Sequence, residues 1–462
     1  MRDLLLAFFW MAAVPLSFLS PAAGVSFWVW DALLSPTELV YSFMVSVPTN
    51  KLAAFATLFG IFSKPKEWDY YLDKLGVLLI LLGICTTISW ISAITSWDVD
   101  TELYLKVIKE IVLAFVLMYL LKTQRWMHVC ALLVVISISF LGVKEGLISL
   151  LTVGGHKIIG SRAIGDNNQL AAALVVVVPL LMFSYKQVES RTIRNGLLVA
   201  LVLNVITVMM TLSRGGFIGL LCLAFLYLTS SKQRVRAILV MASFALILYM
   251  VAPEAWFTRV DTINEATDDS SFMGRVIAWK ISWLIAEDNP LFGGGMHAVQ
   301  HGPVWFRYSL QLPKLAWIPT PPPDINPHAA HSLIFEVLGD LGFVGLGIYA
   351  LLFATSYIYL GKTLRLCRNR PELNWVSDLA QSIKFSLILY FITGLLLSVA
   401  YFELLFILFA FSSRCLRTAR LTNVVVAEST TVAKFKPQLH AIGGATPSMS
   451  DTLRSRRRRT ML

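Results

Sequence analysis

Four basic side chains could carry chemistry, because each lies within or beside a long apolar run. They are Arg162, Arg214, Arg275 and His331. A charge at membrane depth is costly and usually marks a functional site. Arginines bind phosphate groups through forked hydrogen bonds, and a histidine, which titrates near neutral pH, can accept a proton from a hydroxyl. Together these residue types suit the binding of a pyrophosphate and the deprotonation of a hydroxyl.

Arg214 is the sharpest case. In the sequence VMMTLSRGGFIGLL it carries the single charge between two apolar stretches, and the two glycines after it let backbone or ligand come close. The alternative is a cation that reaches from the helix end to the membrane interface. A short outward turn needs no arginine for topology, so an anion-binding role is favoured.

The other candidates have their own alternatives. Arg162 precedes a predicted helix whose first residues include Asn168, and a helix N-terminus favours an anion; ordinary loop polarity is the other interpretation. Arg275, in SSFMGRVIAWK, could instead lie on a solvated helix face. His331 opens a long apolar run, with His328 as a competing proton acceptor, although a lone histidine is more often structural.

The motifs that are missing narrow the chemistry. The sequence has no Walker loop, no HExxH, no convincing GxSxG elbow and no well-placed Asp-x-Asp. Asp268 and Asp269 are adjacent in a polar turn and are disfavoured as a metal site. We therefore expect no metal and no cofactor. Because ATP and sugar nucleotides are absent outside the cell, group transfer there should use a donor activated in advance, such as a polyprenyl pyrophosphate.

Composition identifies the class of protein that must position these residues. Of the 462 residues, 56% are hydrophobic and only 15% are charged, whereas soluble domains carry about 25% charged residues. Many apolar runs are long enough to span a bilayer, which takes roughly 20 residues as helix. A soluble enzyme, a coiled coil, a disordered scaffold and a secreted disulfide mini-protein are excluded. The later runs cover about residues 75–95, 103–121, 126–151, 168–185, 194–212, 214–230, 235–252, 331–360 and 381–413.

Charge distribution predicts the orientation. Lys and Arg gather in alternate loops, which the positive-inside rule assigns to the cytoplasm, and the four basic candidates then lie on the outer side. The final run, 381–413, is longer than one span needs and predicts a hairpin turning near Val399–Glu403. Four prolines break the first 62 residues into pieces, of which we take two as crossings. The expected fold is therefore an all-α polytopic membrane protein of about twelve transmembrane helices with both termini in the cytoplasm.

Four segments follow from this pattern. Residues 1–252 are expected to form an N-terminal bundle of about nine helices, and 331–413 about three more. Residues 253–330 form an outer loop or cap that is rich in proline and contains one amphipathic helical segment followed by a glycine-rich turn. Residues 414–462 carry eight of the eleven net positive charges and predict a disordered cytoplasmic tail able to touch anionic lipid headgroups. A nucleic-acid partner is therefore not expected.

Several motifs resemble those of the O-antigen ligase/polymerase superfamily. They run from Ser213-Arg214-Gly215-Gly216 through Met273-Gly274-Arg275 and Asn289-Pro290-Leu291 to Ala330-His331-Ser332 with Phe335-Glu336. The opening MRDLLL with Trp28-Val29-Trp30 and Ser35-Pro36 is similar to a subgroup of O-glycosylation ligases associated with exosortase systems. Ser35-Pro36-Thr37 departs from that subgroup, which tends to have Asn-Pro-His there.

The resemblance implies a GT-C-like glycosyltransferase of the bacterial inner membrane. Such enzymes move a glycan from undecaprenyl pyrophosphate to an acceptor on the periplasmic face without a metal. By resemblance, Arg214 and Arg275 stabilise the leaving pyrophosphate and His331 activates the acceptor hydroxyl. Arg162 is a less direct match, and Glu403 is the candidate for a late acidic residue of the family.

Three functions compete. The first is an O-antigen ligase, which joins the glycan to lipid A–core. The second, with the same donor, is a polymerase or a protein O-oligosaccharyltransferase. The third is a transporter of lipid-linked or anionic solutes, which should have broken helices and polar sites near mid-membrane. The charged candidates gather at the outer rim, which favours an enzyme.

Overall fold

A computed structural model describes residues 1–64, 68–95, 97–152, 155–161, 164–230, 270–316 and 319–439. Arg162, the pair Asp268-Asp269 and the predicted span 235–252 lie outside the described residues. The chain divides into two units, Met1–Leu416 and Arg417–Leu462. In the second unit, residues 417–439 are helical. All features below belong to the first unit.

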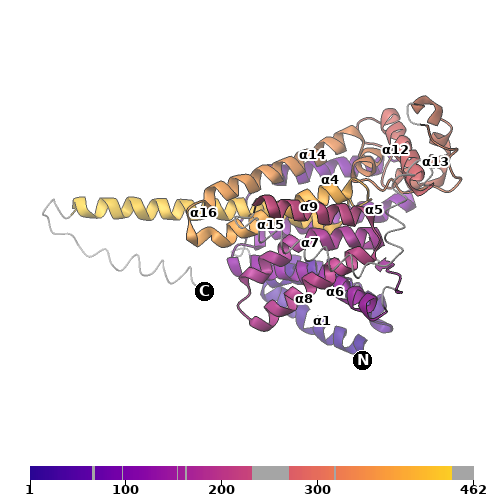
Figure 1. Cartoon of the computed structure of the whole chain (residues 1–462). Coiled ribbons are helices and arrows are strands. Elements are labelled where there is room, and N and C mark those ends of the chain that lie inside the picture. Colours follow the sequence, from indigo (N-terminus) through magenta and orange to yellow (C-terminus); the bar gives the residue numbers. More distant parts are fainter. Residues whose placement is uncertain are drawn as a thin grey trace. The chain divides into compact units, whose positions relative to one another are not determined.

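The described chain is almost entirely helical, which confirms the all-α class (Figure 1). Its strands are β1 (Gly160–Ser161) and β2 (Gly165–Asp166), which pair antiparallel. The helices before the predicted cap are α1 (Arg2–Leu19), α2 (Pro21–Leu34), α3 (Thr49–Ser63), α4 (Lys74–Ile91), α5 (Trp97–Leu120), α6 (Gln124–Leu151), α7 (Asn167–Gln187), α8 (Arg191–Met210) and α9 (Arg214–Ser230), with short 3-10 turns η1 (Pro36–Leu39) and η2 (Phe43–Ser46).

The remaining elements begin with α12 (Ser270–Asp288), η5 (Ala298–Gln300), α13 (Gly302–Ser309) and η6 (Leu312–Leu315). They end with α14 (Leu333–Cys367), η7 (Pro371–Leu373), α15 (Asn374–Gly394) and α16 (Glu403–Leu439). The apolar run 381–413 is thus divided between two helices, and the segment 395–402 that joins them contains most of the predicted turn.

Prolines shape the N-terminal helices as expected with one exception. Pro21 is the first residue of α2, Pro36 begins η1 and Pro48 is the N-cap of α3, positions where a missing N–H costs nothing. Pro15 lies inside α1 without ending it, so the expected break there is wrong.

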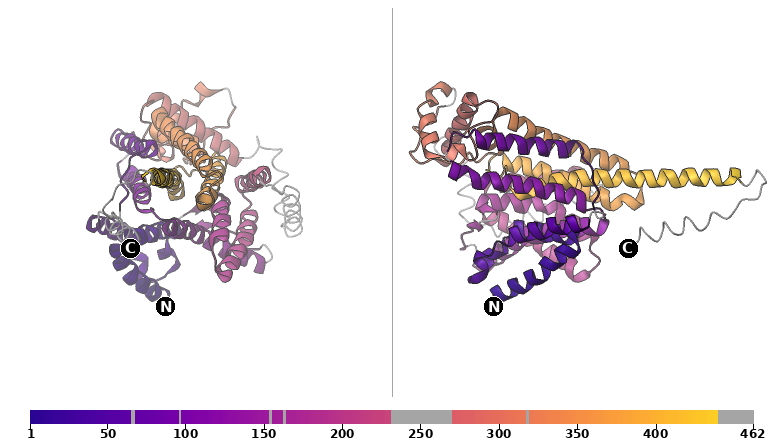
Figure 2. Two further views of the ribbon diagram at one scale, coloured as in Figure 1. Left: turned by 90° about the vertical axis from the view of Figure 1, so that its left-hand side faces the viewer. Right: turned by 180° about the vertical axis from the view of Figure 1, so that it is seen from behind.

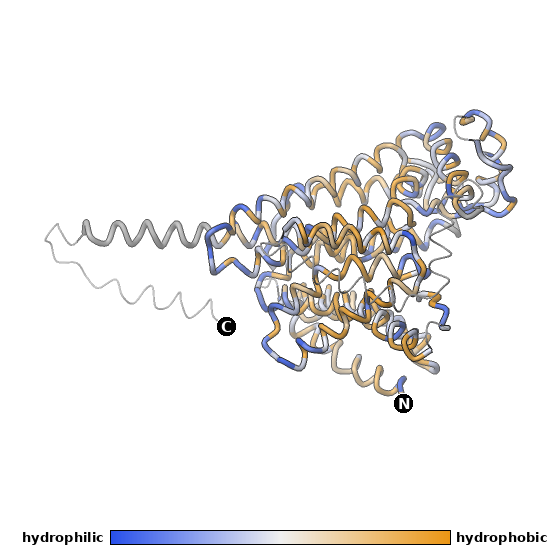
Figure 3. The backbone as a smooth tube through the Cα atoms, viewed as in Figure 1, coloured by the Kyte–Doolittle hydropathy of each residue, from blue (hydrophilic) through white to orange (hydrophobic). Residues whose placement is uncertain are grey.

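The helices have the apolar character of a membrane protein. Within the described residues, six are long and apolar enough to cross a membrane by length and composition: α1, α4, α6, α7, α8 and α14. Apolar residues dominate the bundle helices, whereas polar ones gather in the loops (Figure 3). Helix α7 is buried along nearly all its length between α6, α8, α9 and α15, as expected for a helix that is apolar all round.

The segment between α9 and α14 has an apolar core of its own. Helices α12 and α13 lie together at one end of the helix bundle (Figures 1 and 2). The amphipathic segment predicted at Met273–Ile285 lies within α12, which ends at Asp288 in the glycine-rich turn. The shared core comprises Ile277, Ala278, Ile281, Leu284, Ile285, Ala298, Val299, Val304, Trp305, Tyr308, Leu312 and Ala330.

A glycine-to-glycine contact joins this segment to α14. Helix α14 is broken at Gly342, whose φ is 66°, and Gly293 of the turn after α12 also has a positive φ of 69°. A Cβ on Gly342 would lie 2.7 Å from the Gly293 nitrogen, and a Cβ on Gly293 would lie 2.5 Å from the Asp340 carbonyl. Only glycine fits at either position without moving backbone.

The break at Gly342 frees backbone groups of α14, which bind to the turn after α12 and to α4. Gly294 N–H donates to the Gly339 carbonyl at 2.8 Å, and Phe343 N–H donates to the Pro290 carbonyl at 2.9 Å. Ser89 Oγ of α4 donates to the Asp340 carbonyl at 2.7 Å. The groups that a broken helix leaves are thereby paired, as they must be away from water.

We predict that Gly342→Ala destabilises the protein strongly. A left-handed conformation costs a residue with a Cβ roughly 1–2 kcal/mol, and displacement of the 290–295 turn should raise the total loss to about 2 kcal/mol or more. The measurement is thermal unfolding of the full chain in detergent. Gly347→Ala, in the same helix with nothing within 4 Å of the added Cβ, is the matched control and should be neutral or slightly stabilising. Equal midpoints for the two variants would contradict the prediction.

Candidate functional site

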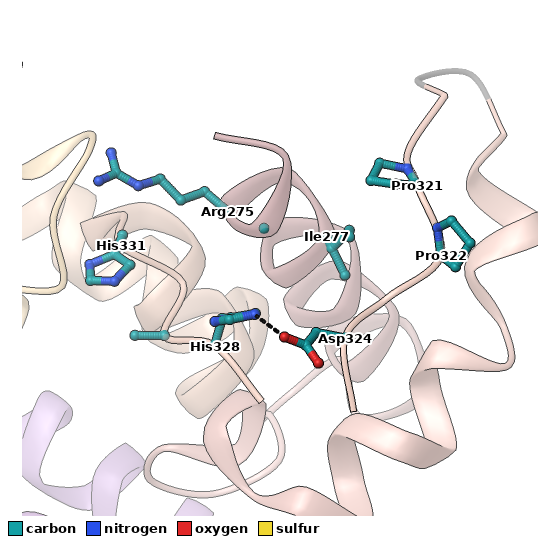
Figure 4. Close-up of a pocket in the computed structure, with 9 residues that line it drawn as sticks. Arg275, Ile277, Pro321, Pro322, Asp324, His328 and His331 are labelled. Carbon is teal, nitrogen blue, oxygen red and sulfur yellow. Dashed lines mark ion pairs between the residues drawn. The ribbon is translucent and has the colours of Figure 1, made fainter. Parts of the chain in front are cut away.

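A cavity of about 480 Å³ opens between the start of α12 and the chain that leads into α14. Three residues predicted from the sequence line it, namely Arg275, His328 and His331. Arg275 and His331 lie on one side, the prolines at 321 and 322 on the other, and His328 with Asp324 between them (Figure 4). The structure thus brings together Arg275 of α12 and two histidines of the non-helical chain before α14, up to 56 residues apart in the sequence.

His331 is held from two directions. It has a left-handed backbone, with φ of 43°, and its N–H donates to Ser398 Oγ at 3.0 Å. The carbonyl of the preceding Ala330 accepts a 2.6 Å hydrogen bond from Trp279 Nε1, and the Trp279 ring stacks on Phe335 at 5.3 Å. In the described part of the chain His331 Nδ1 is buried and has no hydrogen-bond partner.

The surroundings of His331 favour its neutral form. Burial lowers the pKa of the imidazole, and the positive charge of Arg275 and the neighbouring His328 lower it further. The negative charge of Asp166, at the start of α7, raises this pKa. An imidazole with a lowered pKa is neutral at neutral pH and can accept a proton.

Trp305 holds the other side of the pocket. Its Nε1 donates to the Asp324 carbonyl at 2.8 Å, and its ring meets His328 edge-to-face at 5.6 Å. His328 Nε2 and Asp324 Oδ2 are 3.8 Å apart (Figure 4). The buried indole therefore binds the main chain of Asp324 and packs against the His328 ring.

The segment 395–402 between α15 and α16 is a part of the site that the sequence did not reveal. Ser398 binds His331, and its own carbonyl accepts from Gln169 Nε2 at 2.6 Å. Glu336, one turn into α14, accepts the Ala400 N–H at 2.9 Å. Tyr349 OH donates to the Ala400 carbonyl at 2.8 Å. The one signal in the sequence for the contact between Glu336 and Ala400 was the glutamate itself, five residues after His331 in an apolar run. Nothing in the sequence pointed to Ser398.

The start of α7 connects this region to the Arg214 turn. Asp166 caps α7, accepting the N–H groups of Asn168 and Gln169 at 2.9 Å each. Asn167 Nδ2 donates to the Thr211 carbonyl at 2.8 Å, two residues before the Ser213 that caps α9. Through these bonds the N-termini of α7, α9 and α14 converge, which gathers the positive ends of three helix dipoles.

The other predicted residues lie outside the pocket lining. Arg214 is the first residue of α9, and Asn168 lies in the first turn of α7. Glu403 begins α16, where its Oε1 is 3.5 Å from Lys106 Nζ. Arg162 falls outside the described residues. Over the described ranges, no group of three or more His, Cys, Asp or Glu side chains is arranged to hold a metal ion.

Comparison with known families gives two matches. Residues 199–350 match the family described as O-antigen ligase, a range that includes Arg214, Arg275, His328 and His331. Residues 1–189 match a family described as a family of unknown function (DUF5935). No curated protein matches the chain. The first match confirms the resemblance to the O-antigen ligase superfamily and supports a ligase- or polymerase-type transferase in the membrane.

Proposed function

We propose that this chain, a member of the O-antigen ligase superfamily, is an O-antigen ligase of the bacterial inner membrane. It would transfer a glycan from undecaprenyl pyrophosphate to a hydroxyl of lipid A–core on the periplasmic face, without a metal. The observation that carries this proposal is the shared cavity of Arg275 and His331. A fixed cation and a neutral imidazole side by side suit a leaving pyrophosphate and an attacking hydroxyl.

The proposed step is a single inverting displacement. The acceptor oxygen attacks the anomeric carbon and forms the new C–O bond, while the bond from that carbon to the pyrophosphate oxygen breaks. His331 takes the hydroxyl proton, and the electron pair leaves on the pyrophosphate. Arg275 and Arg214 stabilise this charge, an electrostatic contribution that is usually the largest in enzymes. General-base catalysis by His331 adds roughly 10²–10⁴-fold.

The remaining candidates take supporting roles in this proposal. The N–H groups at the start of α7 are bound by Asp166 and that of Gly216 by Ser213, so attraction for an anion near Arg214 comes from the helix dipoles and from Arg214 itself. Asn168, in the first turn of α7, and Arg162 would contact the donor's pyrophosphate or glycan, and Glu403 the glycan. A GT-C-like arrangement of about twelve spans with both termini in the cytoplasm would keep the site on the outer side, and the basic tail would touch anionic lipids.

The structure weakens the case for a transporter. A transporter uses a broken helix to bind its solute at mid-membrane. Helix α14 is broken, but its freed groups at residues 339, 340 and 343 are bound by the 290–295 turn and Ser89. A polymerase or a protein O-oligosaccharyltransferase would use the same pocket, so only the acceptor distinguishes these from the ligase.

We predict transfer to lipid A–core that resists EDTA. The purified full chain would be given a lipid-linked glycan with lipid A–core, with the lipid-linked glycan alone, or with a serine-rich protein. His331→Ala should lower the transfer rate by about 10²–10⁴-fold at an unchanged level of folded protein. A longer lipid-linked glycan in the reaction with lipid-linked glycan alone, without transfer to lipid A–core, would identify a polymerase, and product on the protein would identify an O-oligosaccharyltransferase. Loss of transfer in EDTA would refute the metal-free mechanism.

Arg275 tests the phosphate-binding role. Removing a group that stabilises charge in the transition state typically costs 10²–10³-fold in kcat, and we expect a loss of about this size for Arg275→Ala. Arg275→Lys should also fail, because a lysine cannot make the forked contact. Arg307→Lys, which changes an exposed side chain of α13 near Asp288, is the control and should leave kcat unchanged. Full activity of Arg275→Lys would show that a point charge suffices.

The pH profile tests the base. The rate should fall as pH drops through the pKa of His331, which lies below the usual value of 6.5. Asp166 holds this pKa up, so Asp166→Asn should lower it and move the acidic limb of kcat/KM to lower pH. Asparagine still caps a helix, which preserves α7. Asp378→Asn, which removes a carboxylate beside Lys186, is the control. An acidic limb that stays in place or moves upward in Asp166→Asn would argue against His331 as the base.

A further inference from the structure

The pocket has two parts of different chemistry. On one side, Arg275 lies beside His331; beyond them come the Asp324–His328 pair and then the exposed rings of Pro321 and Pro322 (Figure 4). A carboxylate repels a pyrophosphate, so the second part cannot serve the charged end of the donor. It suits a neutral ligand that is rich in hydroxyl groups.

We propose that Asp324 and His328 form a binding subsite for a sugar ring of the acceptor. The proposal rests on the proposed function and identifies which part of the same pocket selects the acceptor. The Asp324 carboxylate accepts hydrogen bonds from sugar hydroxyls, and the His328 ring offers a nitrogen to a neighbouring hydroxyl. The flat apolar faces of Pro321 and Pro322 pack against the C–H groups of the ring.

The subsite is built before any ligand arrives. Trp305, which is 1% exposed, binds the Asp324 carbonyl and the edge of His328. Lys280 Nζ of α12 donates to Thr320 Oγ1 at 3.3 Å, which ties the proline segment to the same helix. A main chain held in place loses little freedom on binding, so less of the binding free energy is spent on ordering this segment.

Gly274 connects the subsite to the reactive side of the pocket. A Cβ at this position would lie 3.8 Å from His328 Cδ2, so the imidazole lies over the first turns of α12. The next residue is Arg275. A sugar bound at Asp324 and His328 would therefore lie beside the helical turn that carries the proposed phosphate ligand, in the cavity that His331 also lines (Figure 4).

The Asp324–His328 pair contributes little to folding, so variants of it test ligand binding without loss of stability. The Asp324 and His328 side chains are 59% and 44% exposed, and their 3.8 Å separation is long for an ion pair. Such exposed pairs contribute roughly 0–1 kcal/mol to stability. Asp324→Asn should therefore leave the unfolding temperature unchanged while it weakens binding of the acceptor.

The experiment measures acceptor binding separately from turnover. The full chain in nanodiscs is titrated with fluorescent lipid A–core, and KM for lipid A–core is measured at saturating lipid-linked glycan. We expect Asp324→Asn to raise both the Kd and this KM about tenfold, because a neutral amide replaces a charged acceptor and one of its two oxygens becomes a donor, with KM for the donor unchanged. His328→Ala should act in the same direction. Asp288→Asn, a carboxylate near Arg307 that does not line the pocket, is the matched control and should change neither constant.

The outcomes separate the subsite from the proposed function. An unchanged Kd and KM for lipid A–core in Asp324→Asn, or a change in the donor KM alone, would overturn the subsite. The same holds if the native chain fails to bind lipid A–core. If the native chain binds lipid A–core through Asp324 but transfers no glycan to it, the subsite stands and the ligase reaction is wrong.

Discussion

The contact between Gly293 and Gly342 is the constraint on which the geometry of the site depends. Arg275 is carried by α12, which is followed by the turn that contains Gly293, and His331 lies two residues before α14, which is broken at Gly342. Because each glycine lies where any Cβ would meet the other backbone, the two helices have one close-packed relation rather than a range of them. This contact and the hydrogen bonds that surround it constrain the positions of the two candidate side chains relative to each other.

Buried carboxylates in α14 extend that constraint to the far side of the pocket. Glu336 accepts the Ala400 N–H, and Asp340 Oδ2 accepts from Tyr401 OH at 3.1 Å. Burying a carboxylate is costly unless it is hydrogen-bonded, so these two groups favour the one arrangement of the 395–402 segment that satisfies them. Ser398 lies in that segment, and it holds His331 in a backbone conformation that non-glycine residues rarely adopt. Such a conformation costs roughly 1–3 kcal/mol and persists where the surrounding structure holds it.

Much of the helical fold, and part of the candidate site, could be predicted from the sequence. Apolar runs identified the helices, and charges at their ends singled out Arg275, His328 and His331, because both signals are local. Ser398, Trp305 and Asp324 could not be found in this way. Ser398 acts on a residue 67 positions away, and no periodicity encodes such a contact. The break expected at Pro15 was wrong: this proline lies in the second half of α1, and the helix continues past it to Leu19.

Within the proposed reaction, the effect of the Arg275 charge on the pKa of His331 depends on whether the donor is bound. Burial and the charge of Arg275 lower the pKa of His331 and favour the neutral imidazole. A pyrophosphate beside Arg275 would offset this positive charge, and the pKa of His331 would rise by the same Coulombic argument. The histidine would then become a stronger base only when a leaving group is in place. Arg275 therefore does not weaken the proposed base, because the pyrophosphate that Arg275 binds offsets the charge that lowers the pKa of His331.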